Sequence, residues 1–232
     1  MFDKRLRPSV EQHLRPVGAN LERSGVTADH LTLLGVVMAV GAAMAIGSGA
    51  LRLGFVLLLS SAVPDVLDGA VAKASGTASP RGAFFDSVAD RVTDALLLGG
   101  VAWYLATRHG GRIAVLPMAV LALSMLISYE RAKAESLGYD ARGGLMERAE
   151  RIVALATGLL FEGLLIAVLW VMLALTTFTA VQRFVRVWSQ ASPERPKPEI
   201  ARWRARRAAR VSGRTRMRRE RWAATRHMRR KP

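Results

Sequence analysis

The sequence predicts an all-α integral membrane protein with six transmembrane helices, an amphipathic N-terminal helix on the membrane surface and a basic C-terminal tail. Half of the 232 residues are hydrophobic (51%), and they gather in long runs. Several runs reach about 20 residues, the length that crosses roughly 30 Å of hydrocarbon. The net charge of +16 is concentrated at one end, because residues 195–232 contain 16 Arg and Lys against two acids. The high pI therefore describes the tail.

The first 26 residues form a polar segment with regularly spaced apolar side chains. The spacing of three or four is that of an amphipathic helix, at Phe2, Leu6, Val10, Leu14, Val17 and Leu21. Basic residues between them favour a helix that lies on an anionic membrane surface. Thr27 or Asp29 is expected to cap the helix that follows.

Five apolar ranges follow this segment and supply the six predicted crossings. They are residues 31–50, 51–71, 83–106, 113–129 and 152–181. The last range is too long for one upright crossing, so we expect a turn near 161–163, where Glu162 interrupts it.

Six crossings place both termini on one side of the membrane. The N-terminal segment, the loop with Lys73 and Arg81, the loop from 131 to 151 and the tail are all basic, so the positive-inside rule places them in the cytoplasm. We therefore expect a multi-pass protein of the cell membrane. Its predicted parts are an amphipathic helix (1–26), a six-helix domain (27–190) and a basic tail (191–232).

Four aspartates stand near the ends of the second and third apolar ranges. Asp65 and Asp68 are three residues apart, and Asp86 and Asp90 are four apart, so each pair lies on one helix face. Converging carboxylates are typical ligands of hard cations, so the pattern predicts Mg²⁺ or Mn²⁺. The alternative is that the acids are solvated helix ends with basic partners at Lys73, Arg81 and Arg91.

Residues 65–90 read D-x2-D-G-x2-A-K-x8-G-x3-D-x3-D. This stretch resembles the signature of the CDP-alcohol phosphotransferase family, which are membrane enzymes with six transmembrane helices. The resemblance implies that the four aspartates bind two metal ions and that Asp90 is the general base. It implies a substrate whose lipid lies in the bilayer and whose nucleotide lies at the interface, here CDP-diacylglycerol, with CMP as the leaving group.

The same resemblance implies a set of CDP-diacylglycerol contacts. Lys73 stands where the family has arginine, so it keeps the charge but lacks the bidentate fork for phosphate. The implied contact residues are Asp29, Thr32, Gly69, Lys73, Ser79 and Gly82.

A basic cluster between residues 128 and 151 suits an anionic, phosphorylated acceptor. Its S-Y-x-basic-A-basic-A-E and G-G-x-x-E-R-x-E-R patterns resemble a narrower group of that family, the actinobacterial phosphatidylinositol phosphate synthases. By that resemblance Ser128, Arg151 and Arg183 hold the phosphate of inositol 1-phosphate, with help from Arg131 and Lys133. The resemblance also implies a homodimer.

Several alternatives stay open at this point. Within the family, the acceptor could be that of a phosphatidylglycerophosphate synthase or another CDP-alcohol phosphotransferase. Outside it, a divalent-cation transporter also places carboxylates in the membrane, and a scaffold would leave the acids unexplained. For the tail, attraction to anionic lipid is favoured over nucleic acid, because the tail begins where the last helix leaves the membrane.

Overall fold

The computed structural model describes residues 27–74 and 79–192, with the backbone alone for 65–74. The described elements are helices and short 3₁₀ turns, and no strand occurs among these residues. The helices are α2 (Ala28–Gly47), α3 (Leu51–Ala74), α4 (Pro80–His109), α5 (Val115–Ser136), α6 (Arg148–Leu160) and α7 (Leu165–Ala191), with 3₁₀ turns η1 (Gly111–Ala114) and η2 (Glu162–Leu164). The expected helix at 1–26 and the tail from 193 onward lie outside the described residues.

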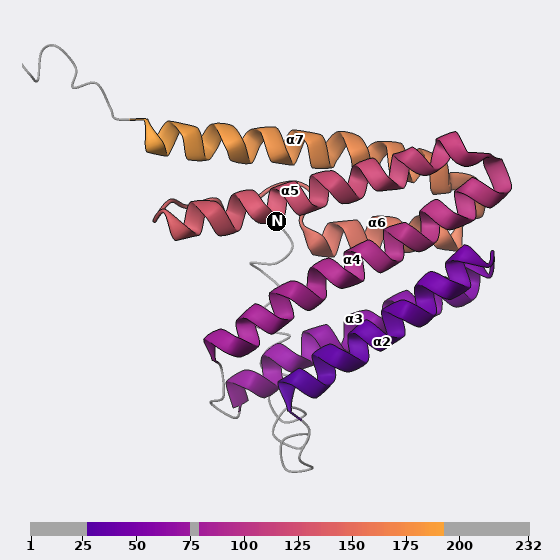
Figure 1. The fold of residues 1–232 in the computed structure, drawn as a ribbon, viewed down its shortest axis with the longest axis horizontal. Coiled ribbons are helices and arrows are strands. Elements are labelled where there is room, and N and C mark those ends of the chain that lie inside the picture. Colours follow the sequence, from indigo (N-terminus) through magenta and orange to yellow (C-terminus); the bar gives the residue numbers. More distant parts are fainter. Residues whose placement is uncertain (1–26, 75–78, 193–232) are drawn as a thin grey trace, which may run out of the picture. The chain divides into compact units, whose positions relative to one another are not determined.

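Successive helices run in opposite directions within the compact unit Met1–Ser189 (Figure 1). The connections from α2 to α3, α4 to α5 and α6 to α7 lie together at one end. Each is short, which favours antiparallel neighbours. Helices α2, α4 and α6 therefore begin at the opposite end, where α3, α5 and α7 finish.

Two helix starts at that end are fixed by side-chain caps. Thr27 Oγ1 accepts a hydrogen bond from the backbone N–H of His30, and His30 Nδ1 accepts one from the backbone N–H of Thr27. This reciprocal capping box shows that Thr27, rather than Asp29, caps α2. Ser79 caps α4, with its Oγ accepting from the Gly82 N–H at 3.1 Å.

The predicted turn at 161–163 is confirmed. Helix α6 ends at Leu160, η2 follows, and α7 begins at Leu165. Glu162, the residue that interrupted the apolar pattern, accepts a hydrogen bond from the Tyr104 hydroxyl of α4 at 2.6 Å. The turn is thereby attached to the end of α4.

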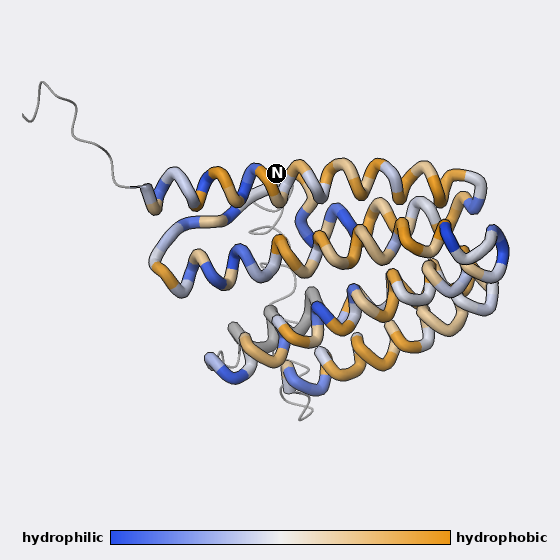
Figure 2. Tube along the Cα trace, turned by 45° about the horizontal axis from the view of Figure 1, so that its top comes forward, coloured by the Kyte–Doolittle hydropathy of each residue, from blue (hydrophilic) through white to orange (hydrophobic). Residues whose placement is uncertain are grey.

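Apolar side chains occur both in the interior of the bundle, where they pack together, and on its outer surface. All six helices contribute to one buried core, centred on residues such as Leu58, Leu105, Val120, Leu159 and Leu169. Large apolar side chains are also exposed on the outside of the helices. In Figure 2, hydrophobic residues recur along most of α2, α5 and α7. Such a surface is expected where the solvent is lipid.

Three segments of the described chain are long and apolar enough to cross a membrane. They are Ala28–Gly47, Gly111–Ser136 and Glu162–Ala191, and Leu51–Pro64 is a shorter apolar helix. Helix α6 has 13 residues, about 20 Å, and α4 carries charged residues along its first half. The described part of the chain is therefore all-helical and has the apolar helices of a membrane protein.

Candidate functional site: an acidic helix face among arginines

A line of polar positions runs along one face of α4. Gly82, Asp86, Asp90 and Asp94 follow one another at intervals of four residues, so they occupy successive turns of the same face. Asp86 and Asp90 belong to the predicted metal ligands, whereas Asp94 lies one turn beyond them and was not predicted. The line extends from the capped start of α4 into the core.

The other two predicted ligands lie on the last turns of α3, where only the backbone is described. Asp68 stands six residues before the end of α3 and Asp86 six residues after the start of α4. Asp65 and Asp90 stand nine and ten residues from the same two helix ends. Because the two ends are joined by residues 75–79, the acids lie at matching depths of about 9 and 15 Å.

Three of the residues expected to contact the nucleotide meet beside the start of α4. A Cβ atom added to Gly82 would lie 3.4 Å from Ser79 Oγ and 4.0 Å from Asp29 Oδ1. Thr32 is one turn further along α2, with its hydroxyl donating to the Ala28 carbonyl at 3.1 Å. For the remaining two, Gly69 and Lys73 on α3, only the backbone is described.

The carboxylate of Asp90 lies between two guanidinium groups. Arg148 Nη1 contacts Oδ1 at 2.7 Å, and Arg91 Nη2 contacts Oδ2 at 3.3 Å. Arg91 also donates to Ser128 Oγ, which brings this predicted acceptor residue close to the proposed base. The partnership with Arg91 confirms one element of the alternative interpretation, although Asp90 lies well inside α4 rather than at a solvated end.

Asp94 holds a second, more deeply buried ion pair. Its side chain and that of Arg151 are 7% and 6% exposed, and Arg151 Nη2 lies 2.6 Å from Asp94 Oδ2. Arg148 Nε lies 4.0 Å from Asp94 Oδ1. Arg148 thus reaches both Asp90 and Asp94. Neither Arg148 nor Asp94 was among the predicted site residues, although Arg148 precedes Arg151 by three residues on α6 and Asp94 continues the four-residue spacing of α4.

Arg183 of α7 is buried and joins three segments. Its Nη1 donates to the Ile127 carbonyl of α5 at 2.7 Å, and its Nη2 donates to the Gly143 carbonyl at 3.3 Å and lies 3.7 Å from Glu147. Its Nε is buried and has no hydrogen-bond acceptor among the described residues. The guanidinium therefore holds the loop before α6 against α5 and α7, and its Nε–H makes no hydrogen bond there.

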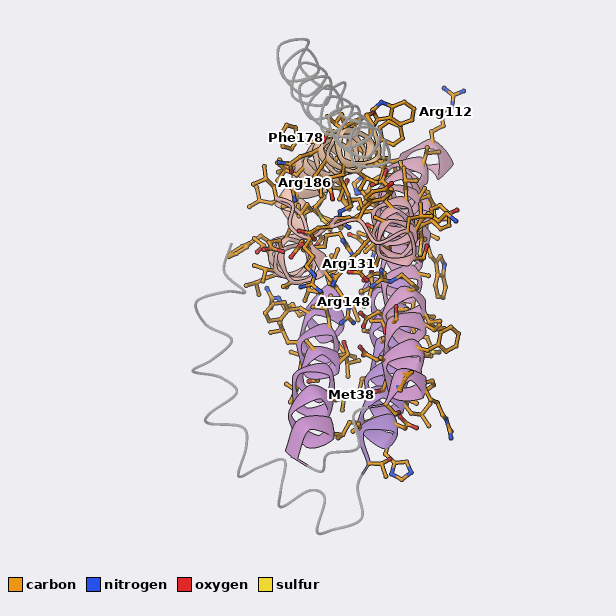
Figure 3. All side chains as sticks on the ribbon, turned by 90° about the vertical axis from the view of Figure 1, so that its left-hand side faces the viewer. Met38, Arg112, Arg131, Arg148, Phe178 and Arg186 are labelled. Atoms are coloured by element: carbon orange, nitrogen blue, oxygen red, sulfur yellow. The ribbon has the colours of Figure 1, made fainter. Side chains whose placement is uncertain are left out.

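Arg131 and Lys133 are exposed at the end of α5. Arg131 pairs with Glu135 on its own helix, at 3.0 Å, and its charge also acts on Arg183. In Figure 3, which looks onto the end where α2 begins, Arg148 lies toward the middle of the helices and Arg112 of η1 points outward. The structure thus joins Ser128 and Arg151 to the α4 acids through Arg91 and Asp94, but leaves Lys133 on the surface.

The donor set of the site fits a hard divalent cation. Four carboxylates, two from each of two helices joined by a short connection, offer oxygen ligands at matching depths. No group of three acids or histidines suited to a metal occurs among the residues whose side chains are described, and that part of the chain excludes Asp65 and Asp68. The two described acids are thus half of the proposed set.

Comparisons with known proteins agree with this geometry. The model of the CDP-alcohol phosphatidyltransferase family matches residues 25–189. An archaetidylinositol phosphate synthase of Methanothermobacter thermautotrophicus is 36% identical over 190 residues, covering 79% of this chain and 93% of the relative. A phosphatidylinositol phosphate synthase of Mycobacteroides abscessus is 34% identical over 185 residues, covering 76% and 84%.

Solved structures show the same fold. A crystal structure of Mycobacterium tuberculosis phosphatidylinositol phosphate synthase with CDP-DAG bound superposes with a TM-score of 0.72 at 30% identity, covering 79% of this chain and 96% of that one. The same enzyme in complex with manganese and citrate gives 0.72 at 29% identity, covering 79% and 92%. By its family match, its relatives and its site, this chain belongs to the CDP-alcohol phosphatidyltransferase family.

Proposed function

We propose that the chain is a metal-dependent phosphatidyltransferase that moves the phosphatidyl group of CDP-diacylglycerol onto inositol 1-phosphate and releases CMP. One observation carries the proposal. Asp90 lies between the nucleotide end of α4 and a cluster of arginines, with Arg148 2.7 Å from its carboxylate. A proton acceptor is thus next to cations that suit a phosphorylated alcohol. The named relatives and the CDP-DAG complex support the same substrates.

Asp65, Asp68, Asp86 and Asp90 are proposed to hold two Mg²⁺ or Mn²⁺ ions. The manganese complex of the Mycobacterium tuberculosis enzyme supports this assignment. Bound there, the ions would neutralise the pyrophosphate and the charge that develops on its bridging oxygen. The acids stand about 9 to 15 Å along their helices from the α3–α4 connection. This depth suits the pyrophosphate of a substrate whose lipid lies in the bilayer and whose nucleotide lies at the interface.

The nucleotide is proposed to lie at the start of α4. Ser79, Gly82 and Asp29 meet there, and Gly82 permits close approach because it has no side chain. Thr32, Gly69 and Lys73 complete the proposed set, in which Lys73 would supply a single charge and no bidentate fork for phosphate.

The acceptor phosphate is proposed to bind among Ser128, Arg131, Lys133, Arg151 and Arg183. The position of Arg183 supports this role, because its guanidinium donates to the carbonyl of Ile127, the residue before Ser128, and so lies beside that turn of α5. Asp90 then takes the proton of the attacking hydroxyl. The hydroxyl oxygen bonds to the phosphorus that carries the lipid, the bond from that phosphorus to the bridging oxygen breaks, and CMP leaves with the electron pair.

The membrane arrangement is proposed from the same residues. Six helices cross the cell membrane, with both termini and the site on the cytoplasmic side, and the chain forms a homodimer. Residues 1–26 lie on the membrane surface, 27–190 form the catalytic domain and 191–232 form a basic tail. The antiparallel order of α2 to α7 and the basic residues at the site end support this arrangement.

The proposal is tested with purified protein, Mg²⁺ or Mn²⁺ and CDP-diacylglycerol. CMP release is measured with inositol 1-phosphate, glycerol 3-phosphate, inositol and serine as acceptors. We expect release with inositol 1-phosphate and formation of the phosphorylated lipid product by mass spectrometry. Release with glycerol 3-phosphate alone would reassign the acceptor, and release with none of a broad panel would exclude the transferase.

A further inference from the structure

We infer that Asp94 is a positioning residue that sets the affinity for the phosphorylated acceptor. It lies one turn beyond Asp90 on α4 and holds Arg151 and Arg148 of α6 toward the reacting face. The inference rests on the proposed function, because it assigns a role in binding the acceptor of that same reaction.

Burial gives the first argument. Asp94 and Arg151 are 6% and 5% exposed and lie 2.6 Å apart, in a region lined by Leu97, Leu98 and Leu155. An isolated charge in such surroundings is costly, and each of the two therefore requires the other. Without its carboxylate partner, Arg151 would lose the contact that fixes its direction.

The geometry of Arg148 gives the second argument. Arg148 and Arg151 are three residues apart on α6 and so share a helix face. Arg148 contacts Asp90 at 2.7 Å through Nη1 and lies 4.0 Å from Asp94 through Nε, so its guanidinium spans two acids on successive turns of α4. Asp94 therefore fixes Arg151 by a direct hydrogen-bonded ion pair and attracts Arg148 electrostatically.

A rigid pair of arginines has a chemical consequence. Guanidinium groups that are already oriented lose less freedom when they bind phosphate, so the complex forms more tightly. Asp94 is separated from Ser79 and Gly82 by three to four turns of α4. Its removal should weaken the acceptor and leave the nucleotide substrate nearly unaffected.

The test is steady-state kinetics of Asp94→Asn, which removes the charge and keeps the shape. We expect KM for inositol 1-phosphate to rise about tenfold or more, as for the loss of a charged hydrogen bond. KM for CDP-diacylglycerol should change less than twofold. Thr93→Val is the matched control, because Thr93 is the adjacent residue of α4 and is equally buried. This control should leave both KM values unchanged.

A double-mutant cycle tests the route through α6. Arg148→Gln should raise the same KM, and Asp94→Asn combined with Arg148→Gln should be less severe than the product of the two single effects. Arg148 is 20% exposed, so this variant serves even where Asp94→Asn folds poorly. Multiplicative effects would show that Asp94 does not act through Arg148 and would overturn that route.

The outcomes separate the two proposals. An active wild-type protein whose Asp94→Asn variant keeps its acceptor KM, or loses stability and kcat alone, overturns the positioning role and leaves the transferase intact. If the wild-type protein prefers another phosphorylated alcohol, the proposed acceptor is wrong, and the KM ratio for that alcohol decides the role of Asp94. A wild-type protein that transfers to no acceptor overturns both.

Discussion

The two halves of the bundle are held together by different means. Between α2 and α4 the backbones approach closely, and a Cβ atom added to Gly100 would lie 2.7 Å from the Ala43 carbonyl oxygen. Around α5, α6 and α7 side-chain hydrogen bonds and ion pairs cross between elements, as at Arg183 and Arg151. Helix α4 takes part in both kinds of contact, and the acids of the site lie along it.

The difference shows how an apolar solvent changes helix packing. Lipid offers no hydrophobic reason for two helices to meet, so close van der Waals contact at small residues and polar contacts between helices replace it. The first half, α2 to α4, uses close van der Waals contact at small residues, and the lipid-linked nucleotide is proposed to bind there at the start of α4. The second half, α5 to α7, uses polar contacts, which gather the arginines proposed to bind a phosphorylated acceptor. Each kind of packing thus suits the substrate proposed beside it.

The largest expected effect is at the acid where the two halves meet. Asp90→Asn removes the proposed base and a metal ligand, so CMP release should fall by a factor of about 10³ or more. The thermal unfolding temperature in detergent should stay close to that of the wild-type protein, because asparagine retains the shape. Asp140→Asn, the same change in the exposed loop before α6, should retain activity. Near-normal activity of Asp90→Asn would assign the base to another group.

The features predicted from sequence are those that depend on neighbouring residues. The apolar middle of each helix and the turn at Glu162 follow from hydropathy over neighbouring residues, whereas α4, α5 and α7 extend beyond the apolar ranges that predicted them. The acidic face of α4 was likewise visible as a four-residue interval. Each of these features involves residues that are close together in the sequence and also close together in space, so the sequence alone is enough to predict it.

The arginine network could not be derived in the same way. Arg151 meets Asp94 across 57 residues and Arg183 meets the Ile127 carbonyl across 56, so no local pattern records the pairs. Arg151 and Arg183 were predicted as phosphate ligands by resemblance, and the structure adds that both already hold protein groups. Asp94 was missed, and Arg148 was predicted only as a member of the basic cluster between residues 128 and 151, because a helical spacing alone does not show which side of α6 faces α4.

The close backbone approach of the first half is broken by one added methyl group. Gly100→Ala places a Cβ atom 2.7 Å from the Ala43 carbonyl oxygen and 2.9 Å from its Cα atom. Helix α2 must then move away from α4, and we expect a loss of about 3 kcal/mol in unfolding free energy. Thermal unfolding in detergent measures it. Gly99→Ala is the control, since a Cβ atom there meets nothing within 4 Å, and alanine, the better helix former, should leave stability unchanged or raise it. Equal losses at both positions would show that the close approach of α2 to α4 does not decide the cost.

In the second half, Arg183→Met removes a buried guanidinium that holds two carbonyls and Glu147. We expect a loss of about 2 kcal/mol in unfolding free energy, since the Gly143 carbonyl and Glu147 lose a charged donor. Arg112→Gln, the same kind of change at an exposed arginine of η1, should cost much less. Similar losses for both variants would show that the cost follows from removing an arginine rather than from the junction between α5 and α7.

The smallest expected loss of stability comes from a single hydrogen bond between α7 and the loop before α6. Thr179 Oγ1 accepts from the backbone N–H of Met146 at 3.2 Å and joins the loop before α6 to α7. Thr179→Val leaves that buried N–H without its acceptor, which should lower the unfolding free energy by about 1 kcal/mol. Thr176→Val is matched in burial and chemistry, but the Thr176 hydroxyl donates to the Met172 and Leu173 carbonyls of its own helix. A loss of unfolding free energy confined to Thr179→Val would show that stability around α5 to α7 depends on hydrogen bonds between elements. Equal losses would show that it depends on the hydroxyl groups within α7 itself.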